Sequence, residues 1–83
     1  MTSGIYAIIN KNNDKLYIGS ASDIFYRFHK HKYHLTKGTH INEHLQSAWN
    51  KYGKTAFDFL IVQVVNKIEL LRKHEQEWMD LTK

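Results

Sequence analysis

The segment from Gly4 to Gly19, with the sequence GIYAIINKNNDKLYIG, constrains the fold more than any other part of this chain. Two runs rich in Ile, Tyr and Leu flank the pair Asn12-Asn13. Asparagine tolerates the positive φ that a two-residue hairpin loop demands. The pattern therefore predicts an antiparallel β-hairpin with Asn12-Asn13 as its loop.

The register of this predicted hairpin decides which side chains share a face. Tyr6 lies opposite Gly19, and Ile8 lies opposite Tyr17. Because side chains alternate across a strand, Tyr6 and Tyr17 are diagonal neighbours on one face, and Gly19 leaves space beside the Tyr6 ring. Cross-strand aromatic pairs also stabilise hairpins without any further function. The opposite face is apolar and consists of Ile5, Ala7, Ile9, Leu16 and Ile18.

The length and residue content limit what such a hairpin can belong to. The 83 residues form one expected domain, 1–83, with one modest core. There is no apolar run near the length of a membrane span and no signal-peptide pattern, so we expect no membrane contact. The chain has no Cys, which excludes disulfides and Cys-based zinc sites. This composition suits a reducing intracellular location, cytoplasmic or nucleoid-associated.

The charge is distributed unevenly along the chain. The net charge is +4, and no acidic residue occurs between Asp23 and Glu43. A segment whose charged residues are all basic indicates an anionic partner, most simply a nucleic acid. The alternative is a basic surface that contacts only solvent. The interval also holds most of the six histidines, and its cations are Arg27, Lys30, Lys32 and Lys37.

The same interval predicts a basic amphipathic helix over residues 22–37. The segment Ser20 to Asp23 supplies N-cap residues, and Gly38 suits a left-handed cap at the other end. Arg27 and His31 are one helical turn apart, so both side chains can contact the same ligand. The buried stripe of this helix is expected to be Ile24, Phe28 and Leu35, with His31 on the same side.

A second helix is predicted from near Asn42 to Gly53, and the link before it holds His40 close to the basic helix. Residues 56–65 then form the strongest strand signal. The strand is apolar on both faces, so we expect it beside the hairpin with helices covering both of its sides. The expected buried stripe of the second helix is Ile41, Leu45, Ala48, Trp49 and Tyr52. One expected face of the strand is Phe57, Phe59, Ile61 and Val65, and the opposite face is Leu60, Val62 and Val64.

The last helix places a carboxylate among apolar residues. Asn66 and Glu69 form a capping-box pattern at its start. Glu75 falls in the middle of the expected buried stripe, whereas Glu77 points to the opposite side. A carboxylate on a buried face needs a partner, either an internal ion pair with Arg27 or Arg72 or a bound metal ion. The stripe itself is Ile68, Leu71, Trp78 and Met79.

The predicted order is strand, strand, helix, helix, strand, helix. This order predicts a small α/β domain of the α+β kind, in which three helices flank a three-stranded, mainly antiparallel sheet.

Two triplets in the hairpin, Gly4-Ile5-Tyr6 and Tyr17-Ile18-Gly19, resemble the signature of the GIY-YIG nuclease family. The resemblance extends over about residues 3 to 81. Residues 23–28 followed by His31 resemble the helical motif of the family with its arginine, which falls on Arg27. Segments 37–40 and 45–53 resemble the intron-encoded, phage-type homing endonuclease branch, and residues 74–80 resemble the segment with the metal-binding glutamate, which falls on Glu75.

This resemblance implies metal-dependent hydrolysis of DNA phosphodiester bonds. It implies Mg²⁺, or another divalent cation such as Mn²⁺, with Glu75 as metal ligand; Mg²⁺ commonly binds one or two carboxylates and keeps several waters. Arg27 would hold the phosphate oxygens. Tyr6 would be the general base, provided that Arg27, the metal ion or Lys15 lowers its pKa. Further candidates are Tyr17 to position water or phosphate, His31 to hydrogen-bond a tyrosine or the phosphate, and His40 for phosphate contact or proton transfer.

Family members usually carry an Asn shortly after the last helix, and homing relatives attach a separate DNA-binding region. The sequence ends at Lys83 before either feature, so we expect a catalytic-domain fragment of a longer protein with its C-terminal DNA-binding region outside this chain. Two rival functions remain. One is a non-catalytic nucleic-acid-binding module that uses the basic helix 22–37. The other is a histidine-rich metal-binding or protein-interaction domain, although the histidine spacing matches no zinc pattern.

Overall fold

The computed structural model describes residues 1–82, and its elements follow the predicted order. Within these residues, no helix is long and apolar enough to cross a membrane. Short 3₁₀ turns at Lys54–Ala56 and Ile68–Leu70 precede the last strand and the last helix. The strands are β1 (Gly4–Asn10), β2 (Lys15–Ala21) and β3 (Phe57–Val64); the helices are α1 (Ile24–Lys37), α2 (Glu43–Tyr52) and α3 (Leu71–Leu81).

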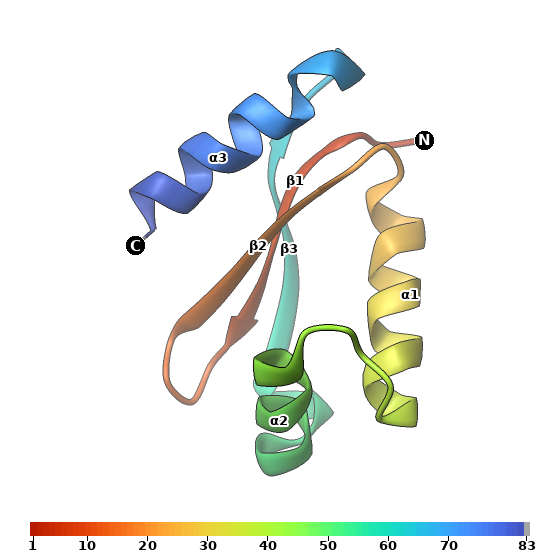
Figure 1. Ribbon diagram of the computed structural model, residues 1–83, viewed down its shortest axis with the longest axis vertical. Coiled ribbons are helices and arrows are strands. Elements are labelled where there is room, and N and C mark those ends of the chain that lie inside the picture. The colour runs from red at the N-terminus through yellow and green to blue at the C-terminus, as the bar shows by residue number, and fades with distance from the viewer. Residues whose placement is uncertain (83) are drawn as a thin grey trace.

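The three strands form one antiparallel sheet in the order β2-β1-β3, so β1 is central (Figure 1). The predicted register is confirmed, because Tyr6 pairs with Gly19 and Ile8 pairs with Tyr17. Consequently Tyr6 and Tyr17 share one face of the sheet.

The predicted two-residue loop Asn12-Asn13 is wrong. The loop has four residues, 11–14, and it is Asp14 that has the positive φ of 59°. Asparagine side chains support this wider loop: Asn10 accepts a bond from the Asn12 amide at 2.9 Å, and Asn13 accepts one from the Lys15 amide at 3.0 Å. The register is unaffected, because both loops are centred on the same peptide bond.

Helices cover both faces of the sheet, with α3 and α1 on opposite sides of the strands (Figure 1). One core cluster joins the Tyr6 face to α1 and α2, and the other joins the opposite face to α3. The first contains Tyr6, Ile8, Ala21, Ile24, Phe28, Leu35, Leu45, Ala56 and Phe57, whereas the second contains Ile5, Val65 and Leu71.

The expectation that helices cover both sides of β3 is wrong. Leu60 is 45% exposed and Val64 is 58% exposed, because β3 is an edge strand and β1 takes the fully buried place. A bulge in the pairing between Ile5 and Tyr6 also shifts the alternation. Val65 therefore packs with Ile5 on the α3 side, not on the side of Phe57 as expected.

The capping of α1 and α2 is as predicted. Asp23 accepts a bond from the Tyr26 amide at 3.3 Å, and Gly38 ends α1 in the left-handed region with φ 78°. Asn42 caps α2 through the Leu45 amide at 3.1 Å. Ile41, however, is 96% exposed rather than buried, because it precedes this cap and does not reach the core.

The predicted capping box of the last helix is wrong. No side-chain bond caps its start, because the 3₁₀ turn at Ile68–Leu70 separates Asn66 from α3. Ile68 lies in that turn and is 60% exposed. Leu71 and Trp78 face the sheet, as expected. Met79, which was also expected in the buried stripe, is 37% exposed.

Candidate active site

Tyr6 is the most enclosed of the predicted site residues. Its ring is 4% exposed and packs edge-on against Phe28 with centroids 5.4 Å apart. Its hydroxyl forms a hydrogen bond of 2.7 Å with Nε2 of His31. An ideal Cβ on Gly19 would overlap the Tyr6 hydroxyl, so the ring extends from the central strand directly across β2. The hydroxyl is thereby held beside β2.

Tyr17 packs against the same core cluster and is half-buried on β2. Burial raises its pKa above the ordinary value of a phenol. Lys15 lies with Nζ 5.8 Å from the centroid of the Tyr17 ring, so this lysine is associated with Tyr17 rather than with Tyr6. The two phenols therefore have different surroundings, and Tyr6 is the one bonded to a histidine.

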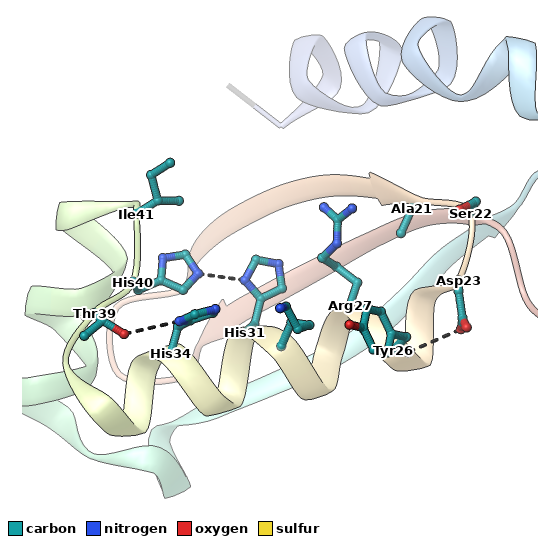
Figure 2. A pocket seen from close by; sticks show the side chains of 11 residues that line it. Ala21, Ser22, Asp23, Tyr26, Arg27, His31, His34, Thr39, His40 and Ile41 are labelled. Carbon is teal, nitrogen blue, oxygen red and sulfur yellow. Dashed lines mark hydrogen bonds between the residues drawn. The ribbon is translucent and has the colours of Figure 1, made fainter.

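Arg27, His31 and His40 lie along one side of α1 and line a cavity of about 610 Å³ (Figure 2). Arg27 and His31 come from successive turns of α1, and His40 comes from the link before α2. Nδ1 of His31 is 2.7 Å from Nε2 of His40, and the planes of the two rings are inclined by 22°. Tyr6, His31 and His40 thus form one continuous hydrogen-bonded chain.

Glu75 approaches from the other face of the sheet. It is half-buried on α3, and its Oε1 accepts a bond of 2.7 Å from the hydroxyl of Ser20 on β2. Within residues 1–82 it forms no ion pair with Arg27 or Arg72, so the first of its two possible partners, an internal ion pair, is absent. A hollow of about 270 Å³ adjoins it and is lined by Arg72, Glu75, Gln76 and Met79.

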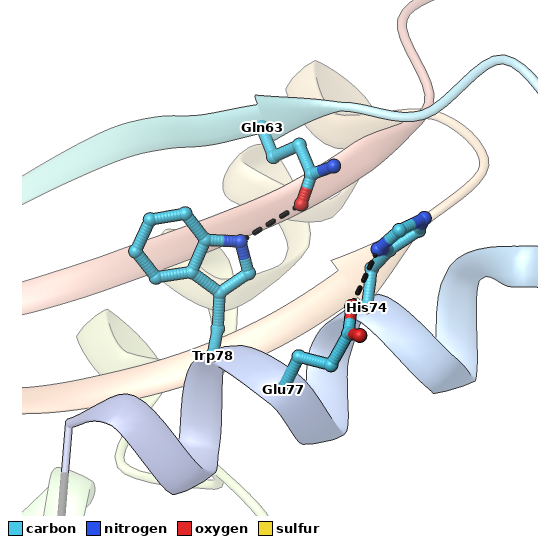
Figure 3. A network of polar contacts seen from close by, with 4 residues as sticks. All are labelled: Gln63, His74, Glu77 and Trp78. Carbon is cyan, nitrogen blue, oxygen red and sulfur yellow. Dashed lines mark hydrogen bonds and ion pairs between the residues drawn. The ribbon is translucent and has the colours of Figure 1, made fainter.

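Contacts along α3 explain why Glu75 faces the sheet. Trp78 donates its indole N–H to Gln63 of β3 at 2.9 Å, which fixes the rotation of the helix (Figure 3). On the exposed side, Glu77 pairs with His74 at 2.8 Å. Glu75 lies three residues before Trp78 and so shares its face, as the helical periodicity predicted.

The pKa of Tyr6 responds to charged groups on both sides of the sheet. Burial raises the pKa of Tyr6; the Arg27 guanidinium acts against this shift, and the Glu75 carboxylate adds to it. Both charges are therefore within electrostatic reach of one phenol. Arg27 acts on the pKa of Tyr6 in the expected direction, but in the protein alone burial outweighs it.

Burial favours the neutral form of the two hydrogen-bonded histidines, His31 and His40. Burial, followed by the charges of His40 and Arg27, lowers the pKa of His31 to about 4. Burial also lowers the pKa of His40. Neutral imidazoles can each donate one hydrogen bond and accept another, which suits the chain that ends on Tyr6.

The side chains near Glu75 suit a hard divalent cation that takes few ligands from the protein. In the part of the chain that the structure describes, no group of three or more His, Asp or Glu side chains is arranged to hold a metal ion. One carboxylate with water and phosphate oxygens is a combination that Mg²⁺ accepts. Glu75 is thus suited to bind such an ion through its carboxylate while Ser20 orients it.

Three residues near the site escaped prediction. Ser20 bonds Glu75, His34 lines the cavity and bonds Thr39 at 3.2 Å, and Gln46 is buried beside the His40 link. The position of Ser20 directly after the second triplet was a usable signal. No sequence signal separates His34 and Gln46 from ordinary surface residues.

The chain is similar in sequence to one family of catalytic domains. The family model described as the GIY-YIG catalytic domain matches residues 2–83. The chain is 35% identical over 79 residues to "Intron-associated endonuclease 1" of Enterobacteria phage T4, covering 95% of this chain and 32% of that protein. It is 40% identical over 60 residues to "Probable intron-encoded endonuclease 1" of Neurospora crassa, covering 72% of this chain and 18% of that protein.

A solved structure extends the agreement to three dimensions. The structure named "catalytic domain of intron endonuclease I-TevI, E75A mutant" superimposes with a TM-score of 0.90 at 35% identity, covering 99% of this chain and 84% of that one. The chain spans less than a third of the length of the curated relatives it matches. The sequence match, the fold and the shared arrangement of elements establish that this chain belongs to the GIY-YIG catalytic domain family.

Proposed function

We propose that this domain is the catalytic part of a DNA endonuclease, and that it hydrolyses phosphodiester bonds with a divalent cation, Mg²⁺ or Mn²⁺, bound through Glu75. The observation that supports this most is geometric: the Tyr6 hydroxyl lies against Gly19, and Glu75 accepts a hydrogen bond from Ser20, the next residue of β2. Tyr6, Arg27 and Glu75 come from three different elements, β1, α1 and α3. The endonuclease names of its relatives support the same reaction class.

The chain's own residues divide the work of the reaction. Arg27 is exposed at the cavity and carries a permanent charge, so it binds the non-bridging oxygens of the scissile phosphate. Tyr6 would act as the base in its phenolate form: its own proton first leaves to solvent, which the Arg27 charge and a bound cation would favour, and the phenolate then takes the proton of the attacking water. Tyr17 holds the water or phosphate in place. Ser20 orients the Glu75 carboxylate. A cation bound to Glu75 would supply positive charge for the phosphate and the leaving oxygen.

Helix α1 provides a surface for the DNA backbone. Lys30 and Lys37 lie near the rings of Tyr26 and Tyr33, at 6.0 Å and 5.4 Å from their centroids. Basic side chains beside exposed aromatic rings suit contact with phosphates and sugars without reading the sequence. Because the relatives are much longer, we propose that site selection belongs to a DNA-binding region outside this sequence.

Incubation with supercoiled plasmid tests the proposal against a non-catalytic binding module. Mg²⁺ is expected to produce nicked and linear DNA, and EDTA is expected to abolish both. Arg27→Ala should lower the cleavage rate by more than it lowers DNA affinity, because the guanidinium stabilises charge that develops in the transition state. Lys73→Ala removes an exposed positive charge on α3 and serves as the matched control. Binding without Mg²⁺-dependent cleavage would establish the binding module instead.

A further inference from the structure

Gln46 is a buried polar residue whose role the site described above does not explain. Its side chain lies on α2, and the residue is only 9% exposed. Its amide nitrogen donates to the Leu35 carbonyl and to the Asn50 side chain, each at 3.0 Å. Its amide oxygen accepts the main-chain N–H of His40, also at 3.0 Å. Gln46 therefore joins the end of α1, helix α2 and the link that carries His40.

The proton position on His40 follows from its neighbour Asn42. The main-chain N–H of Asn42 donates to Nδ1 of His40 at 3.0 Å. A main-chain N–H cannot accept a bond, so Nδ1 of His40 carries no proton. A neutral His40 must then carry its proton on Nε2.

The position of the proton on His31 follows from its bond to His40. Nε2 of His40 is 2.7 Å from Nδ1 of His31, so His40 donates and His31 accepts. A neutral His31 therefore carries its proton on Nε2, which is 2.7 Å from the Tyr6 oxygen. The burial that lowers the pKa of both histidines supports the neutral state that this reasoning requires. His40 therefore donates to His31, and His31 donates to the Tyr6 oxygen.

This polarity has a consequence for the phenol. The Tyr6 oxygen accepts a bond from His31, so the proton of Tyr6 points away from His31. His31 cannot receive the Tyr6 proton unless the chain to His40 is broken. A donor aimed at the oxygen favours the phenolate and opposes the effect of burial on Tyr6.

We propose that Gln46 is a positioning residue that holds the His40 main chain in place and thereby fixes the polarity His40 to His31 to Tyr6, with the Tyr6 oxygen as final acceptor. The link to cleavage rests on the role proposed for Tyr6 above. The polarity itself does not, because it follows from the hydrogen-bond partners and from the neutral state of His31 and His40.

Nitrogen-15 NMR of the histidine rings at pH 7 tests the polarity directly. In the wild-type protein, both His31 and His40 are expected to carry their proton on Nε2. A proton on Nδ1 of His31 would overturn the proposal, whatever the cleavage activity. Conversely, a wild-type protein with the expected tautomers and no cleavage would refute the proposed function and leave the polarity intact.

Two variants test the part played by Gln46. Gln46→Met keeps the size of the side chain but removes its three bonds, and we expect mixed tautomers at His31 with cleavage slowed at least about tenfold. Gln46→Glu keeps an acceptor for the His40 N–H, so we expect His31 in this variant to have the wild-type tautomer. If Gln46→Met does not fold, the tautomer of His31 in Gln46→Glu is the measurement that tests the proposal. Asn50→Ala removes one partner of Gln46 without touching His40, and we expect wild-type tautomers. Wild-type tautomers in Gln46→Met would overturn the assignment.

Discussion

Replacing Gly19 with Ala tests whether the position of the Tyr6 ring governs activity. An ideal Cβ at this position would overlap Cζ and the hydroxyl of Tyr6 and would lie 2.9 Å from Cε1. Since carbon atoms normally meet at about 3.5–4.0 Å, Cε1 alone must retreat by roughly 0.6–1.1 Å. The ring cannot retreat freely, because it is 4% exposed and packs on Phe28.

Two effects follow from this forced displacement. Overpacking of the core is expected to lower the free energy of unfolding by about 1–3 kcal/mol, with about 1 kcal/mol more if the bond to His31 breaks. A displacement near 1 Å in a reacting group costs about 100-fold in rate. Gly19→Ala should therefore fold at 20 °C and nick supercoiled plasmid about 100-fold more slowly than the wild type.

Gly53→Ala is the matched control for stability. Gly53 has φ 84° and ψ 163°, a region that side chains other than Gly rarely adopt, so Ala costs about 1–3 kcal/mol there. Its Cβ would meet nothing within 4 Å, and the site is untouched. We expect loss of stability with normal cleavage, measured by urea unfolding and plasmid nicking. If Gly19→Ala cleaved within about threefold of the wild type, the argument that the ring position governs the rate would be refuted.

Three other perturbations probe single groups. Tyr6→Phe keeps the ring but removes the hydroxyl, so plasmid cleavage should fall by about 10²–10⁴ while the free energy of unfolding falls by only about 1 kcal/mol, the cost of the lost bond to His31; normal cleavage would exclude Tyr6 as the base. Ser20→Ala should raise the Mg²⁺ concentration for half-maximal cleavage by about 10–100-fold, unlike Ser47→Ala on the exposed side of α2, and an unchanged Mg²⁺ dependence would contradict the Ser20 bond to Glu75. The folded pKa of His31, about 4, lies below its ordinary value of 6.5, so the unfolded state binds more protons between these values. Stability to urea should therefore fall as the pH drops from 6.5 toward 4, and by less in His31→Gln; equal losses would contradict the buried neutral histidine.

Local patterns predicted the parts of the fold that depend on local geometry. The hairpin register follows from the alternation of side chains about one loop centre, so it survived an incorrect loop length. The orientation of Glu75 follows from the period of a single helix. The caps Asp23, Gly38 and Asn42 likewise depend on neighbours within a few residues.

The remaining features depend on where distant elements meet. Whether Leu60 and Val64 are covered depends on which strand is central, and both strand orders fit the same apolar pattern. The burial of Gln46 depends on the way in which the His40 link returns across the end of α1. The triplets and their resemblance supplied the site residues that local physics left open, and the geometry then added Ser20 and the His31–His40 bond.

The most direct test of the central claim is the cleavage of supercoiled plasmid by Glu75→Gln in the presence of Mg²⁺. The amide keeps the shape of the side chain and an acceptor for Ser20, but it removes the negative charge beside Tyr6. We predict a folded protein with no detectable Mg²⁺-dependent nicking. Nicking within about tenfold of the wild-type rate would contradict the claim that groups from both faces of the sheet form one metal-dependent nuclease site.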